Sequence, residues 1–121
     1  MKTEGMRARR VAESMRAALS RTLQQTISDP RLGDVTITGV ELSDDLSIAW
    51  IRIRRLLHDD DESRRGALQA LTGAVGRLRK ALAPELRLKR VPELRFAYDE
   101  GVDAARRVEE LLREVDDDRG K

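Results

Sequence analysis

A cluster of six basic residues in the second half of the chain is the most prominent group that could do chemistry. Arginine presents a planar fork that bonds phosphate bidentately, and RNA recognised through its shape and backbone needs little else. The cluster therefore predicts contact with a nucleic acid, and a solvated helix face balanced by acidic neighbours is the alternative. The six residues are Arg77, Arg79, Lys80, Arg87, Lys89 and Arg90.

Two glycines lie directly before this cluster, in the stretch TGAVGRLRK of residues 72–80. The apolar residues on either side keep the three- and four-residue spacing of a helix. Glycine inside a helix costs about 1 kcal/mol relative to alanine, so a pair three residues apart weakens the helix. Either the helix breaks at this point or another molecule must approach it closely.

Residue types that usually carry catalysis are scarce. The chain has no cysteine, which excludes disulfides, thiolate metal sites and cysteine nucleophiles. The single histidine, His58, precedes three aspartates; a divalent-ion site is one interpretation, and a solvated helix-capping loop is the favoured one. No serine has a G-x-S-x-G context, and no Walker loop or dinucleotide fingerprint occurs. We therefore expect no catalysis, no cofactor and no metal.

Charge is unevenly distributed along the chain, although the net charge is only +2. Residues 1–31 carry a net charge of +4 and residues 77–98 a net charge of +5. Residues 32–76 and 99–118 carry net charges of −3 and −6. If the two basic segments share a face, the field at that face favours a polyanion.

Three arginines near the start of the chain extend the basic set. They are Arg7, Arg9 and Arg10. A mobile arm that adds counterion release on RNA is one interpretation, and an ordinary frayed terminus is the other.

The length of 121 residues indicates one small domain, which we place at residues 1–115 with a polar tail at 116–121. No apolar run approaches the roughly 20 residues that cross a bilayer, and no apolar segment follows the charged start. We expect a soluble, cytoplasmic protein that is a monomer.

The apolar spacing predicts a first helix over about residues 6–27, ended by SDPRLG. Two strands follow, over about residues 35–43 and 46–57, as a hairpin with a bulge near Gly39. In the second strand Ala49, Ile51 and Ile53 share one face. Its opposite face carries Trp50, Arg52 and Arg54.

The interrupted helix follows, up to about residue 82, and Pro84 closes it or kinks it. The stretch VPELRFAY predicts a third strand, with Phe96 and Tyr98 facing the core more plausibly than serving as a base-stacking platform. An acidic amphipathic helix over residues 102–115 completes the order. The result is an α+β fold, a three-stranded sheet with helices on one face and a C-terminal helix. The shortage of aromatic residues favours duplex or junction RNA over unstructured single strands.

Four motifs occur in an order and at a spacing similar to those of ribosome-binding factor A. They are RRVAESM, SDPRLG, ALTGAVGRLRKAL and RLKRVPELRFAYD. The resemblance runs from about Arg7 to about Leu112. It implies a type II KH-like fold with the order αββααβ, in which an interrupted helix with an Ala-x-Gly kink replaces the usual GxxG loop.

The matching kink here is Ala74, Val75 and Gly76, so the resemblance adds Ala74 and Gly76 to the RNA-binding residues. Gly73 completes a literal GxxG, which we interpret as incidental. We expect Gly76 to let the axis bend and to let a sugar-phosphate backbone approach. Amides freed by the bend would then point towards phosphates.

The resemblance further implies a non-enzymatic bacterial assembly factor that binds the immature 30S subunit. The implied contact is with 16S rRNA near its 5′ end, where the family assists rRNA processing and late maturation. A partner GTPase associated with release and a link to cold shock are also implied.

Two other functions stay open from the residues alone. The literal GxxG is typical of a general KH-type protein that binds single-stranded RNA. The acidic helix over residues 102–115 could instead make the protein an adaptor that binds other proteins. We favour a structural role for that helix, with its apolar stripe packed on the body of the domain.

Overall fold

The computed structural model describes residues 3–101 of the chain, and the side chains from Met6 onwards. The elements follow the predicted order of helix, two strands, interrupted helix and strand. They are α1 (Thr3–Thr26), the short 3-10 helix η1 (Pro30–Leu32), β1 (Val35–Leu42), β2 (Ile48–Arg55), α2 (Asp61–Gly73), α3 (Val75–Leu86) and β3 (Glu93–Tyr98). The helix expected over residues 102–115 and the tail at 116–121 lie outside the described residues.

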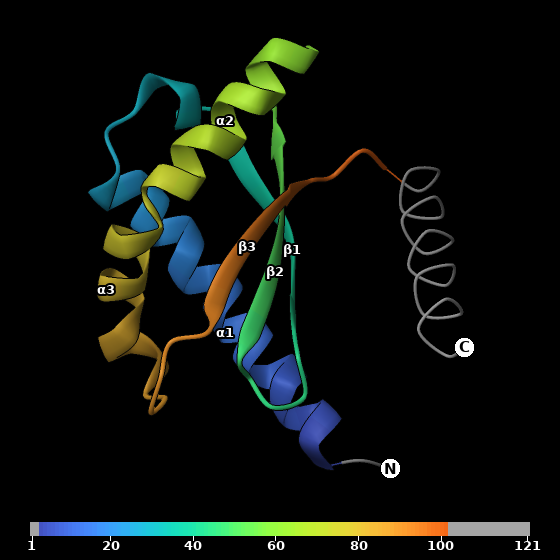
Figure 1. Cartoon of the computed structure of the whole chain (residues 1–121), viewed down its shortest axis with the longest axis vertical. Helices are drawn as coiled ribbons and strands as arrows, with labels where there is room; N and C mark the ends of the chain where they lie inside the picture. The colour runs from blue at the N-terminus through green and yellow to red at the C-terminus, as the bar shows by residue number, and fades with distance from the viewer. Residues whose placement is uncertain (1–2, 102–121) are drawn as a thin grey trace, which may run out of the picture.

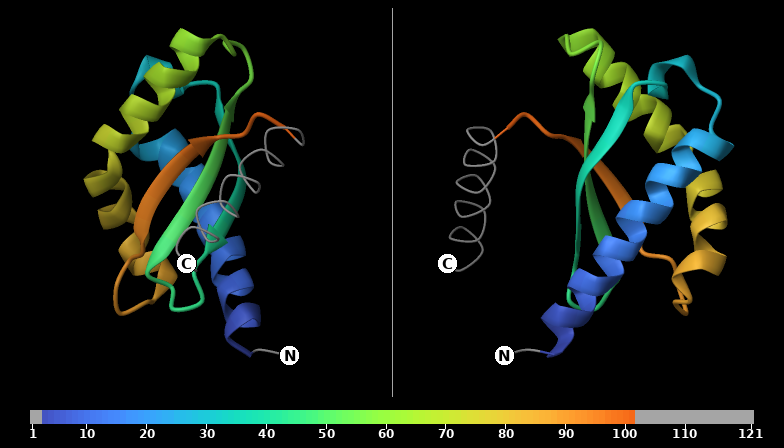
Figure 2. Two further views of the ribbon diagram at one scale, coloured as in Figure 1. Left: turned by 45° about the vertical axis from the view of Figure 1, so that its right-hand side comes forward. Right: turned by 180° about the vertical axis from the view of Figure 1, so that it is seen from behind.

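The sheet has the strand order β1-β2-β3, and all three long helices lie on one of its faces (Figure 1; Figure 2, right). β1 and β2 pair antiparallel as a hairpin, whereas β3 pairs parallel to β2. Two parallel neighbours need a long crossover connection, and α2 and α3 supply it. The predicted α+β class and type II KH-like order are confirmed.

The core lies between the helices and the inner face of the sheet. Ala49, Ile51 and Ile53 of β2 are completely buried, which confirms the alternation predicted for this strand. The helices contribute further completely buried side chains, namely Met15, Leu19, Leu71, Leu78 and Leu82. Burial of one such side chain contributes about 1.5–3 kcal/mol, so this layer fixes how α1 and α3 sit on the sheet.

The predicted bulge is present in β1, where the register shifts between Ile37 and Gly39. One extra residue reverses the alternation of side chains, so Ile37 and Val40 both face the helices. Gly39 then faces outwards, under the guanidinium group of Arg52. A Cβ atom at residue 39 would lie 2.7 Å from an Arg52 nitrogen, so glycine lets the guanidinium group lie against the backbone, and a larger residue would displace it.

Pro84 does not close α3, which was one of the two outcomes expected from the sequence. The helix continues past Pro84 to Leu86. It ends instead at Arg87, which has the left-handed conformation with φ 52° and ψ 31°. A left-handed residue commonly terminates a helix because it turns the chain away from the helix axis.

Candidate nucleic-acid interface

A single non-helical residue, Ala74, separates α2 from α3. Its φ and ψ are −97° and 1°, and its amide donates to the carbonyl oxygens of Ala70 and Leu71 at 3.1 Å each. Its side chain is only 1% exposed and packs in the core. Because the alanine side chain is small, the backbone at the joint between the two helices can pack directly against the core. Ala74 therefore acts through the path of the backbone, because its side chain is not accessible to a ligand.

The expectation that the bend lies at Gly76 is wrong by two residues. Gly76 is the second residue of α3 and is exposed. The break occurs at Ala74 because its buried side chain and its bifurcated hydrogen bond hold the last turn of α2. α3 begins without a side-chain cap, and the first amides of a helix have no partner within it. The start of α3 thus offers N–H groups and the positive end of a helix dipole.

The two glycines that flank the joint are not required by any contact within the described part of the chain. A Cβ atom added at Gly73 or at Gly76 would meet nothing within 4 Å. This differs from Gly39, where the Arg52 guanidinium occupies the space. Open space above both glycines lets a bulky polyanion come close to the backbone at the start of α3.

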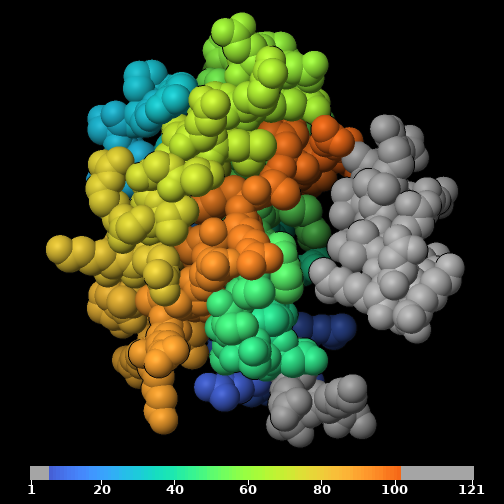
Figure 3. Space-filling view, in the orientation of Figure 1, coloured from blue at the N-terminus to red at the C-terminus, as the bar shows by residue number. Residues whose placement is uncertain are grey.

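The six basic residues of the cluster are all exposed. Three lie on α3 and three in the loop that leads to β3, and Figure 3 shows side chains of both segments projecting from the surface. The ion pairs within residues 3–101 involve other residues. We call Arg77, Arg79, Lys80, Arg87, Lys89 and Arg90 the α3 basic cluster.

Arg79 has a structural contact that the sequence did not suggest. Its guanidinium donates to the Val91 carbonyl oxygen at 2.7 Å. This bond ties the loop after α3 back onto the helix, so Arg79 positions the loop that carries Arg87, Lys89 and Arg90. Arg77 and Lys80 make no such contact within residues 3–101, which makes them the better probes of ligand binding.

One carboxylate, that of Asp29, lies beside the cluster on the side of η1 and reduces its positive charge there. Asp29 pairs with Arg31 at 2.8 Å. The pKa of the Asp29 carboxyl is lowered to about 2, chiefly by hydrogen bonds from the Arg31 side chain and amide, with a smaller contribution from the charge of Arg77. Asp29 therefore stays ionised and lies near Arg77, where it would repel a phosphate placed on that side.

The three N-terminal arginines, expected as a mobile arm or a frayed terminus, are part of the long helix α1. Arg21 pairs with Glu85 at 3.3 Å and thereby marks the flank of α1 that faces α3. Arg10 lies three turns before Arg21 on the same side of the helix, about 16 Å away along the axis. Arg9 instead lines a shallow hollow with Val40, on the β1 side.

The N-terminal arginines therefore do not form one patch with the α3 basic cluster. Arg7 and Arg10 lie on the side of α1 that faces α3. They are separated from the cluster because they lie further along α1 than Arg21, which contacts the end of α3. Arg9 is exposed on the other side of α1, near Glu41 and Asp44. The charge count of the N-terminal segment could not show this split, because it depends on which side of α1 packs against the sheet.

The aromatic residues offer no stacking platform on the helical face of the described residues. Phe96 and Tyr98 are partly buried and pack against the core, as predicted. Trp50 is 42% exposed, but it lies on the outer face of the sheet, away from the helices. The α3 basic cluster can therefore grip phosphates but cannot stack bases, which suits folded RNA.

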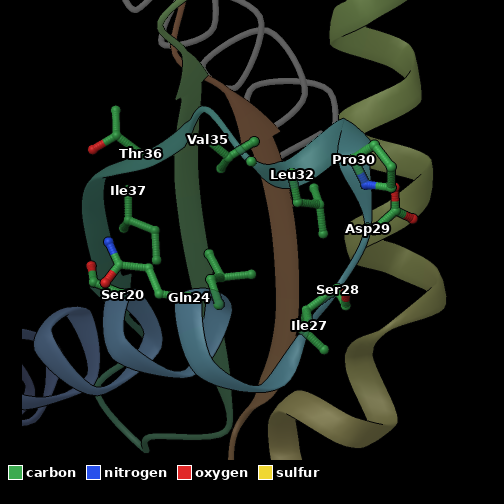
Figure 4. Close-up of a pocket in the computed structure, with 12 residues that line it drawn as sticks. Ser20, Gln24, Ile27, Ser28, Asp29, Pro30, Leu32, Val35, Thr36 and Ile37 are labelled. Atoms are coloured by element: carbon green, nitrogen blue, oxygen red, sulfur yellow. The ribbon is translucent and has the colours of Figure 1, made fainter.

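A well-defined hollow of the described residues lies away from the α3 basic cluster. It has a volume of about 480 Å³ and is formed by the end of α1, residues 27–33 and the start of β1 (Figure 4). Ser20, Gln24 and Thr36 are among the residues that line it, and no residue of the α3 basic cluster is. Within residues 3–101 no group of three histidine, cysteine, aspartate or glutamate side chains could hold a metal ion. No helix among these residues is long and apolar enough to cross a membrane.

His58 lies in a helix-capping loop, as the favoured interpretation predicted. Asp60 caps α2 by accepting from the Ser63 amide at 2.8 Å. The His58 amide donates to Asp34 at 3.2 Å. Sequence reasoning missed Asp34 and its buried partner Arg55, which pair at 2.7 Å. The inward positions of β2 continue from Ile53 to Arg55, and this was the signal that could have found the pair.

The order of elements, the interrupted helix and the exposed cations beside it define a class. The protein is a small α+β protein with a type II KH-like fold and a candidate phosphate-binding surface at the start of α3.

Comparison with known proteins then gives the family. The family model for ribosome-binding factor A matches residues 7–112. The ribosome-binding factor A of Sorangium cellulosum is 47% identical over 112 residues, which cover 92% of this chain and 90% of the relative. That of Geobacter metallireducens is 40% identical over 114 residues, which cover 94% and 95%. The chain belongs to the ribosome-binding factor A family.

Structures of ribosome-binding factor A are similar to this fold. The crystal structure of ribosome-binding factor A from Thermus thermophilus has a TM-score of 0.68 at 30% identity, covering 78% of this chain and 98% of that one. A homology model of the Thermus thermophilus protein, fitted into a cryo-EM map of a complex with 30S, has a TM-score of 0.59 at 34% identity. It covers 71% of this chain and 88% of that chain.

Proposed function

We propose that this protein is an assembly factor that binds the immature small ribosomal subunit through the α3 basic cluster. The observation that carries the proposal is the concentration of six exposed cations beside an uncapped helix start and two unobstructed glycines. Membership of the ribosome-binding factor A family supports it. So does the related protein that was fitted into a map of a 30S complex.

The geometry suggests how folded rRNA would be held. A phosphate at the start of α3 would accept from free amides and gain from the helix dipole, while Arg77 and Lys80 neutralise its neighbours. Arg79 holds the following loop in place, and Arg87, Lys89 and Arg90 extend the contact along the backbone. Binding would keep the RNA in one arrangement and block premature use of the particle.

The finer details of the proposal come from the family. We place the contact on 16S rRNA near its 5′ end, with a role in rRNA processing and late maturation. The protein would act as a cytoplasmic monomer without catalysis, and an assembly GTPase would promote its release. A role in the cold is part of the same proposal.

Sedimentation with purified small subunits tests the assigned face. We expect Arg77→Glu/Lys80→Glu to weaken binding at least tenfold, because two phosphate contacts become repulsive. The slope of log K against log salt should fall by about 1.4–1.8, since each of the two phosphate contacts contributes roughly 0.7–0.9. Arg79 is left unchanged because it holds the Val91 carbonyl.

Arg54→Glu/Arg95→Glu is the matched control. It changes the net charge equally, but both residues are exposed on the outer face of the sheet. Equal losses in the two variants, or no loss in the first, would contradict the assigned face. Tight binding of the wild type to short unstructured oligonucleotides, without preference for subunits, would favour a general KH-type single-strand binder. The adaptor alternative concerns residues 102–115, which lie outside the described residues.

A further inference from the structure

Two leucines at the end of β2 are the most exposed large apolar side chains of the described residues. Leu56 is 70% exposed and Leu57 is 78% exposed. They lie in the connection between β2 and α2, at one end of the sheet (Figure 1). We call this pair the leucine knob. Two adjacent leucines in water gain nothing for the packing of residues 3–101, so their exposure needs an explanation beyond these residues.

The backbone of the leucine knob is held by hydrogen bonds to Asp34. The Leu56 amide donates to the Asp34 carbonyl oxygen at 3.0 Å, and the Leu57 amide donates to the Asp34 carboxylate at 2.9 Å. The other carboxylate oxygen of Asp34 accepts from Arg55 at 2.7 Å, and both of these side chains are 8% exposed. A buried ion pair thus anchors the segment that presents the leucines.

The chain after the knob is held as well. Asp59 accepts from the Tyr98 hydroxyl and pairs with Arg64 at 3.1 Å. Arg64 also lies over the Tyr98 ring, 4.5 Å from its centroid. The connection is therefore held at both ends, so this protein would lose little backbone conformational entropy when a partner binds the knob.

The chemistry around the knob indicates what kind of partner it fits. Leucine side chains cannot bond phosphates or stack on bases in the way RNA recognition requires. Four consecutive carboxylates follow, at residues 59–62, and outnumber Arg64 and Arg65 in the next turn. Asp61 and Glu62 are exposed, and neither belongs to an ion pair within residues 3–101. These two negative charges, unpaired within that range, favour a basic protein over RNA as the partner.

We propose that the leucine knob inserts into an apolar pocket, rimmed by basic residues, on a protein of the small ribosomal subunit. The inference rests on the proposed function and adds a second contact to it. α2 spans about 20 Å between the knob and the joint at Ala74, so the two surfaces can bind different molecules at once. One side of the factor binds rRNA. The other side binds only to small subunits that already contain a particular protein.

Binding of the full chain to separated components tests the inference. The probes are the individual proteins purified from small subunits and, separately, protein-free 16S rRNA. We expect a basic subunit protein to bind the wild type and to bind Leu56→Ser/Leu57→Ser at least tenfold more weakly, because two apolar side chains lose their pocket. Affinity for rRNA and the thermal midpoint should not change. Arg77→Glu/Lys80→Glu is the matched control and should show the reverse pattern.

Four results would overturn the inference. Equal binding of wild type and Leu56→Ser/Leu57→Ser to every subunit protein is the first. A lowered thermal midpoint would mean that residues 102–121 of the same chain cover the leucines. A concentration-dependent dimer that the variant abolishes would assign the knob to a second copy, and loss of rRNA affinity would assign it to RNA. If the wild type binds neither rRNA nor small subunits, the proposed function fails first.

Discussion

Arginines at the start of α3 and at the end of β2 have opposite surroundings. Arg77 is exposed and takes part in no ion pair within residues 3–101. Arg55 is 8% exposed, pairs with Asp34 and donates to the Ser63 carbonyl oxygen at 3.5 Å. One positive charge is available to a ligand, and the other is consumed by the fold. The number of basic residues in a segment therefore says little about binding until their internal partners are known.

The end of β2 and the start of α3 also differ in how many contacts hold them in place. Three side chains hold the end of β2 and the connection that follows it: Asp34 just before β1, Tyr98 of β3 and Arg64 of α2. The start of α3 has a buried alanine beneath it and open space above its glycines. Disruption of the first region should affect stability, whereas disruption of the second should affect binding.

Asp34→Ala should give the largest effect on stability. It leaves the Arg55 charge buried without a partner and removes the acceptor for the Leu57 amide. Breaking a buried ion pair in this way costs about 3–5 kcal/mol, which would show as a much lower urea midpoint. The exposed pair of Arg52 and Glu41 is the control, and Glu41→Ala should shift the midpoint little. A small loss for Asp34→Ala would mean that the pair is not buried in solution.

Stability should also depend on pH through Asp34. Burial alone would raise the pKa of its carboxyl, but hydrogen bonds from the Leu57 amide, Arg55 and the His58 amide outweigh burial and lower the pKa. The group therefore stabilises the fold fully above its unfolded pKa of about 3.9 and loses this contribution as the pH falls through its folded pKa.

Urea denaturation of the wild type and of Asp34→Ala between pH 7 and pH 3 measures this contribution. The difference in free energy of unfolding between the two proteins should be constant near neutral pH and should shrink below about pH 4. A difference that stays constant down to pH 3 would show that other carboxyl groups dominate the acid sensitivity.

Gly76→Ala should give the smallest change in stability, and its sign separates the two regions. A Cβ atom there meets nothing within 4 Å, so the substitution should stabilise α3 by up to about 1 kcal/mol. Binding to small subunits should nevertheless weaken severalfold, because the added methyl group occupies the space that a backbone phosphate would use.

Gly73→Ala is the matched control for this prediction. Residue 73 is equally open, but it lies in the last turn of α2, before the joint. It should gain similar stability with a smaller loss of binding. If Gly76→Ala gains stability and binds as well as the wild type, no molecule approaches the start of α3 closely.

Local patterns were sufficient for most of the fold. The alternation of apolar and polar residues identified the buried face of β2 and the outward position of Trp50. Ile37 and Val40 are an odd number of residues apart, so they can face the same side only if a bulge lies near Gly39. These features depend on neighbours within a few residues, which the sequence shows directly. The exact residue at the joint was missed because burial of Ala74 in the core, rather than glycine flexibility, decides where the helix breaks.

By itself, the sequence determined the order of the elements, the faces that each element buries and the presence of a basic segment after the glycine pair. Only the tertiary structure decided which charges are available, because the partners of a side chain are often distant in the chain. Arg55 meets Asp34 across 21 residues and Arg79 meets Val91 across 12. Packing also set Arg9 on the flank of α1 opposite to the one that faces α3. Periodicity records which side of an element is apolar, but the pairing of charges follows from how the elements are brought together.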